Sequence, residues 1–161
     1  MAAEPIMLTV LKALTVSLEQ IATRGGYNYD LLGAVFRGRM IFSEDDPLPM
    51  LSISQPPKMP EEIEAPTGEA VTVYRQPFLI QGFVTDDPKN PTDPAYLLLD
   101  DVERRLSYER KRDEGYNVLG FGGQVMLHIG QGVVRSPDAV VSDTAFFWLP
   151  ITLEVPHVLL A

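Results

Sequence analysis

"VTDDPKNPTDPAYLLLDDVERRL", residues 84–106, decides the fold because a helix starts within it. Pro94 suits the first turn of a helix, where its missing N–H needs no acceptor, and Asp93 before it is a favoured N-cap residue. Behind them, one apolar stripe repeats at helical spacing: Ala95, Leu98, Leu99, Val102 and Leu106. The stretch therefore predicts an amphipathic helix that is capped by Asp93 and buries one face.

The polar face of this predicted helix carries its charges in a favourable order. Asp100–Arg104 and Asp101–Arg105 are spaced as i,i+4 ion pairs on the outside of the helix. Residues 110–112 are all basic and follow at the end, where the helix dipole favours cations.

The polar residues before the helix raise the alternative of a calcium-binding loop: Asp86, Asp87, Asn90 and Asp93. An EF-hand loop needs oxygen ligands at positions 1, 3, 5 and 12 and a glycine at position 6. Counted from Asp86, position 3 is Pro88 and position 12 is Leu97, neither of which offers a side-chain oxygen. We therefore predict no metal site here and interpret the loop as the lead into a helix.

An earlier amphipathic helix is predicted near the N-terminus. Its apolar residues share one stripe at helical spacing: Met7, Val10, Leu11, Leu14, Leu18 and Ile21. Pro5 stands near the start, and the pair Gly25–Gly26 is typical of a helix C-terminus. The pattern predicts a helix that runs from Pro5 to this glycine pair.

Other segments have the alternation or length of strands: 35–42, 50–54, 71–84, 124–130 and 144–155. In the last, Phe147, Leu149, Ile151, Leu153 and Val155 alternate onto one face, and Phe146, Trp148, Thr152 and Glu154 occupy the other. Pro77 lacks an N–H for a sheet ladder and predicts an edge position or a bulge. The order helix, strands, helix, strands predicts an α+β fold with two helices on one face of a mostly antiparallel sheet.

Length and composition are those of one globular domain spanning residues 1–161, with 45% hydrophobic and 22% charged residues. The net charge of −9 disfavours a surface that grips nucleic-acid phosphates, and the absence of cysteine excludes disulfides and thiolate metal sites. The N-terminus lacks the basic start of a signal peptide, and no apolar run reaches the length of a membrane span. We therefore expect a cytosolic protein that does not associate with membranes.

No arrangement of residues typical of catalysis or cofactor binding is found. His128 and His157 share no metal-ligand spacing, and the serines lack the nucleophile motif of hydrolases. The run Gly120–Gly123 follows a helix and precedes a strand, the reverse of the order in phosphate-binding loops. We expect no enzyme, no cofactor and no metal.

The second face of the predicted sheet carries apolar residues, Val35 among them, that two helices on the other face do not cover. Either loops fold over this face, or subunits associate through it, and we favour association because its aromatic and basic residues are of types enriched at interfaces. Tyr96 and Leu97, which lie outside the apolar stripe of the second predicted helix, are two further candidates. Together the interface candidates are Arg37, Arg39, Trp148, Phe146, Tyr96 and Leu97.

Residues 55–70, QPPKMPEEIEAPTGEA, hold four prolines and four glutamates and are too polar to pack in a core. Loops of this length are commonly functional or disordered, and we predict an exposed, mobile loop that is either a solvated spacer or, as we favour, an arm. Its candidates for contact with a partner protein or a neighbouring subunit are Met59, Glu61, Glu62, Ile63 and Glu64.

Several stretches together resemble the tail terminator proteins of long-tailed bacteriophages: VFRGRMIFSEDDPLPMLSI, FLIQGFVTDDPKNPTDPAYLLLDDVERRL, IGQGVVRSPD and FFWLPITLEV. The resemblance extends from the first helix to the last strand and rests on phrases and element order, with no catalytic signature. It implies a small α+β subunit that closes into a homohexameric ring on the head-proximal end of the tail tube.

The same resemblance implies the partners: other copies of the chain, the tail tube protein and a head-completion or neck protein, with DNA passing through the ring lumen without specific binding. It places the protein in the virion tail, after assembly in the host cytoplasm. Two alternatives stay open. One is another neck or tail-completion ring protein, and the other is a small-ligand-binding or enzymatic α+β domain.

Overall fold

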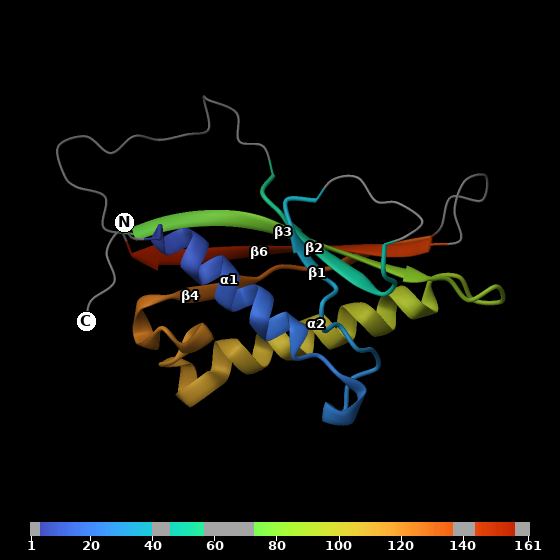
Figure 1. The fold of residues 1–161 in the computed structure, drawn as a ribbon, viewed down its shortest axis with the longest axis horizontal. Coiled ribbons are helices and arrows are strands. Elements are labelled where there is room, and N and C mark those ends of the chain that lie inside the picture. The colour runs from blue at the N-terminus through green and yellow to red at the C-terminus, as the bar shows by residue number, and fades with distance from the viewer. Residues whose placement is uncertain (1–3, 40–45, 57–72, 137–143, 157–161) are drawn as a thin grey trace.

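The computed structural model describes residues 4–39, 46–56, 73–136 and 144–156. Two α-helices and a six-stranded sheet form two layers, with both helices on the same side of the sheet (Figure 1). The helices are α1 (Ile6–Glu19) and α2 (Asp93–Lys111), and the strands are β1 (Val35–Arg37), β2 (Met50–Ser54), β3 (Val73–Thr85), β4 (Met126–Ile129), β5 (Val133–Arg135) and β6 (Thr144–Pro156). The predicted α+β class is confirmed.

The sheet is built around β3 and β6, which pair antiparallel along their entire length. The strand order is β1-β2-β3-β6-β4, and β5 also pairs with β6, on its first half. Of the strands within the described residues, only β1 and β2 run parallel. Pro77 pairs with Thr152 of β6 but lies beyond the last residue of β3 that pairs with β2, Leu79. The missing N–H of Pro77 therefore falls where β3 has one neighbour, as the predicted edge position requires.

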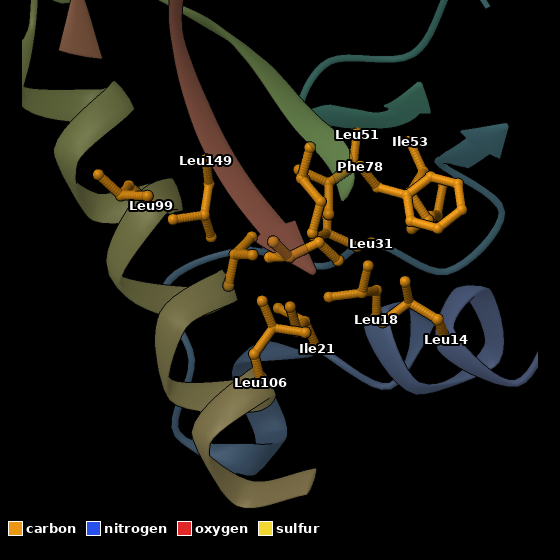
Figure 2. Close-up of a cluster of buried hydrophobic side chains, with 14 of the residues drawn as sticks. Leu14, Leu18, Ile21, Leu31, Leu51, Ile53, Phe78, Leu99, Leu106 and Leu149 are labelled. Carbon is orange, nitrogen blue, oxygen red and sulfur yellow. The ribbon is translucent and has the colours of Figure 1, made fainter. Parts of the chain in front are cut away.

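The core fills the space between the helices and the sheet. Figure 2 shows leucines of α1 and α2, with Ile21 and Leu31 from the segment that follows α1, meeting side chains of β2, β3 and β6. The predicted apolar stripes are confirmed: Val10, Leu14, Leu18 and Ile21 on one side and Ala95, Leu98, Val102 and Leu106 on the other are all fully buried. Helix α1 ends at Glu19, however, and Gly26 closes a separate 3-10 turn, Thr23–Gly25, so the predicted helix end at the glycine pair was wrong.

Helix α2 begins and ends close to its predicted limits but differs in two details. Asp93 is its first residue and Thr92 precedes it as N-cap without a side-chain cap bond, so Asp93 is not the cap that the sequence predicts. Asp100 does pair with Arg104, at 2.9 Å, but Asp101 pairs with Arg104 and not with Arg105. The reason is that Asp101 is fully buried and accepts a hydrogen bond from the loop at Asn28, which is distant in sequence.

That loop is held to α2 by the Asp101 carboxylate. The backbone N–H groups of Asn28 and Tyr29 donate to it at 2.9 Å, as does the Asn28 side-chain amide, and Arg104 donates at 2.8 Å. The guanidinium of Arg104 also donates to the carbonyl of Gly26 and lies 4.8 Å from the centre of the Tyr27 ring. One buried carboxylate thus fixes the segment that connects α1 to the sheet.

Strand β1 is much shorter than the predicted strand 35–42. Gly38 has φ of +70°, a left-handed conformation that ends the extended run after Arg37. Residues 40–42 lie outside the described residues, as do residues 57–72. Within the part of the chain that the structure describes, no helix is long and apolar enough to cross a membrane.

Candidate subunit interface

The face of the sheet turned away from the helices, here called the outer face, is built from every second residue of its strands. Cross-strand pairing aligns these residues into rows. One row is Phe36, Ser52, Gln81, Trp148 and Val133. The next is Met50, Phe83, Phe146 and Arg135. A third, near the opposite end of β3 and β6, is Arg75, Glu154 and Met126.

Aromatic rings gather in the first two rows. Phe83 and Phe146 stack with ring centres 6.1 Å apart, and Phe146 and Trp148 lie 5.8 Å apart. The Arg135 guanidinium is 5.3 Å from the centre of the Trp148 ring, a cation–π contact. The three rings are half-buried, so each keeps surface that a partner can cover.

The opposite end of the outer face is polar. The Glu154 carboxylate lies 2.9 Å from Nε of Arg75 and 3.6 Å from Nε2 of His128, which stands on the neighbouring strand β4. Arg75 and His128 are exposed, so this is a solvated ion pair that contributes little to stability. The face therefore divides into an aromatic end and a charged end.

One side of this face ends in an edge formed by β4 and β5. Among the described residues, no further strand pairs with the far side of either. Gly130 separates them and donates its N–H to the Pro150 carbonyl at 2.8 Å, and a side chain there would lie 2.8 Å from the Pro150 ring. Met126 and Val133 stand on this edge with 51% and 44% of their surface exposed. Exposed apolar side chains along the edge of a sheet are a surface that another strand or subunit can cover.

The structure brings only part of the predicted interface set onto this face. Phe146 and Trp148 stand at its aromatic end, and the Arg39 guanidinium lies over the Phe36 ring at 4.5 Å. Arg37 lies on the helix side, where it donates to Oγ1 of Thr15 in α1 at 2.8 Å.

Tyr96 and Leu97 stay predicted candidates on another surface, the placement of Val35 needs correction, and the arm candidates lie outside the described residues. Tyr96 and Leu97 are exposed on α2, on the helix side of the molecule and away from the outer face. Val35, expected on the second face, is buried against the helices because it pairs with Leu51. The arm candidates Met59 and Glu61, Glu62, Ile63 and Glu64 are not among the described residues.

Val133 and Arg135 belong to the outer face but were missed. The segment that carries them has only three strand residues, too few for an alternation to be read from the sequence. Their place follows only from the pairing of β5 with the first half of β6.

In the polar loop before α2, the Asp87 carboxylate accepts hydrogen bonds from the loop itself. Oδ1 of Asp87 accepts the backbone N–H groups of Lys89 and Asn90, at 2.8 and 3.1 Å, which closes a turn. Across the described residues, no group of three histidine, aspartate or glutamate side chains is placed to hold a metal ion. What the outer face offers chemically is contact area with aromatic, aliphatic and cationic groups.

The sequence matches no protein-family model and no curated protein.

Proposed function

We propose that this protein is a structural subunit of a bacteriophage tail, a tail terminator that forms a hexameric ring on the head-proximal end of the tail tube. Such a ring ends tube polymerisation and provides the surface to which the head or neck joins. The proposal rests on the sequence resemblance together with the character of the outer face. It places the protein in the virion and its assembly in the host cytoplasm.

The observation that carries the proposal is the aromatic end of the outer face. Phe83, Phe146 and Trp148 stand together there, with Arg135 over the indole, on a sheet face that neither helix covers. Buried aromatic residues and arginine are the typical centre of a protein interface. The exposed β4–β5 edge adjoins the same rows, which supports a second copy as the occupant, because subunits that meet through one face and one edge can close into a ring.

The charge of the chain suits a ring around DNA. With a net charge of −9 per subunit, six copies form a strongly acidic assembly that does not retain phosphates as DNA passes through it. The remaining partners of the proposed ring are the tail tube protein and a neck protein, which contact opposite ends of the ring.

The direct test is to image the purified full chain by negative stain, alone and mixed with tail tubes. The expected result is rings of six subunits on one end of each tube, with tubes that no longer elongate. Rings that bind the neck but leave tube growth unchanged would favour a neck or tail-completion protein. A monomer that binds neither tubes nor neck would refute the proposal.

A matched pair of variants tests the interface. Trp148→Ala removes the aromatic centre of the outer face, whereas Leu32→Ala removes a leucine that is 80% exposed in the loop before β1, away from that face. In mass photometry we expect Trp148→Ala to shift rings to monomers at concentrations where Leu32→Ala assembles normally. Circular dichroism should show both variants folded. If both assemble as the wild type does, the outer face is not the interface.

A further inference from the structure

A groove on the helix side of the molecule has a different chemistry from the outer face. It lies between α1, α2 and the turns that follow α2, with a volume of about 370 Å³. Three cationic side chains line it, Lys12, Arg105 and Arg112, and its apolar surface comes from Ala13, Val16 and Leu119.

Positive charge exceeds negative charge in this groove. Among the described residues that line it, Glu109 is the one acidic residue, so three cations and one carboxylate leave an excess of +2 on a chain whose net charge is −9. The Glu109 carboxylate is buried and lies 3.4 Å from Arg112 and 3.9 Å from Arg105. Such long contacts leave both guanidinium groups capacity for a second carboxylate, since arginine carries five donors.

The cations are held in place, but Lys12 can change partners. Nε of Arg105 donates to Oγ of Ser17 at 3.0 Å, and its guanidinium lies 4.8 Å from the centre of the Tyr108 ring. Lys12 pairs with Glu4, and both side chains are exposed. Exposed pairs of this kind contribute little, so an incoming carboxylate can replace Glu4 at small cost.

The turns that follow α2, from which Leu119 contributes to the groove, include strained backbone. Leu119 is buried with φ of +53°, and Asp113 and Glu114 have φ of +49° and +58° although none of the three is glycine. The side chain of Asn117 stabilises this conformation by bonding Asp113 and the N–H of Gly122, at 3.0 and 3.1 Å. Left-handed non-glycine residues cost about 1–3 kcal/mol each and cluster at binding sites. Of the three, Leu119 lines the groove together with Arg105 and Arg112.

We propose that this groove binds an acidic segment of a second copy of the chain, residues 61–64, of sequence Glu-Glu-Ile-Glu. The glutamates complement Lys12, Arg105 and Arg112, and Ile63 complements the apolar surface beside them. The inference rests on the proposed ring, because a ring is what brings the groove of one subunit near its neighbour. It adds a charge-based contact between copies to the aromatic one.

The binding test uses a fluorescent peptide of residues 58–69 and the full chain, followed by anisotropy in low-salt buffer. We expect Arg112→Glu to weaken peptide binding by about tenfold or more. Arg110→Glu is the matched control, since it makes the same charge change two residues away, in the last turn of α2, but does not line the groove. A second variant, Lys12→Glu, changes the charge of the same groove at an exposed residue, so that a folding defect of Arg112→Glu does not decide the result. Equal affinity in all variants, or no binding by the wild type, overturns the proposal.

A mixing test decides whether the segment docks on its own subunit or on a neighbour. One variant carries Arg112→Glu, and the other carries Glu61→Lys, Glu62→Lys and Glu64→Lys. Each alone should assemble poorly, and an equimolar mixture should recover rings, because alternating subunits restore every opposite-charge contact. A mixture that stays defective while the combined quadruple variant recovers would show docking within one subunit and overturn the proposal.

Mass photometry separates this inference from the proposed ring. Normal rings from the Arg112→Glu variant would refute the groove contact and leave the proposed function standing. If the wild type forms no ring but binds the peptide through Arg112, the proposed function fails and the groove remains an acidic-peptide site.

Discussion

Phe147 and Phe146 are neighbours in β6, yet the two faces of the sheet use them in different ways. Phe147 is fully buried under the helices and lies opposite Gly82, where a side chain would approach its ring to 2.1 Å. Phe146 lies opposite Phe83, and the two rings stack on the outer face with part of their surface uncovered. The covered face is thus fitted to one shape, whereas the outer face keeps aromatic surface available.

The largest expected effect tests this difference directly. Phe147→Ala should lower the free energy of unfolding by about 3–5 kcal/mol, because it empties a packed site under the helices. Phe146→Ala, the matched variant one residue away, should cost less than about half of that and act mainly on assembly. Urea denaturation of the monomer measures both. Equal losses would mean that the outer face is as tightly packed as the covered one.

The second effect concerns the buried polar contact in the helix layer. Asp101→Asn keeps the size of the side chain but turns an N–H donor toward donors of Asn28, Tyr29 or Arg104. We expect a loss of about 2–3 kcal/mol by thermal or urea unfolding, the cost of unsatisfied buried groups. Asp100→Asn is the control, because that exposed carboxylate makes only an i,i+4 pair. A loss from Asp100→Asn of similar size would contradict the role given to Asp101.

The smallest effect is a gain in stability. Burial, and secondly the Asp100 carboxylate, raise the pKa of Glu103 above its ordinary value. The folded state therefore binds this proton more tightly than the unfolded state, and ionised Glu103 opposes folding at pH values above its raised pKa. Glu103→Gln should stabilise the protein by at most about 0.5 kcal/mol at neutral pH. The gain should vanish below the pKa of a free glutamate, about 4.3. A gain that persists there would have another origin.

Local pattern was enough to predict most of the layers. The apolar stripes of both helices, the strand Met50–Ser54 and the two faces of β6 follow from spacing alone, because a helix or strand buries the residues that its period places together. The assignment of Phe146 and Trp148 to the outer face follows from the same alternation. Predicting the face on which these two residues lie required no knowledge of which strands pair.

Several of the failures depend on contacts between distant segments. Val35 is buried because β1 pairs in parallel with β2, a register that alternation within residues 35–42 cannot reveal. Asp101 turns from its expected partner because the loop at Asn28 and Tyr29 supplies donors from 72 to 73 residues away. The groove between the helices likewise joins α1 to Leu119, whose left-handed backbone no sequence pattern announces.

The pairing of β3 with β6 has a consequence for how the chain folds. Its partners are separated by 59 residues at Thr85 and Thr144 (144 − 85) and by 83 at Val73 and Pro156 (156 − 73). Closing so long a loop costs chain entropy before any of its contacts form, and topologies rich in such contacts fold in about milliseconds to seconds. Helix α2 lies between the two strands and can form locally, but the sheet that covers its apolar stripe is complete only when β6 arrives. The time that a new chain takes to complete its fold is therefore expected to follow the docking of β6 on β3.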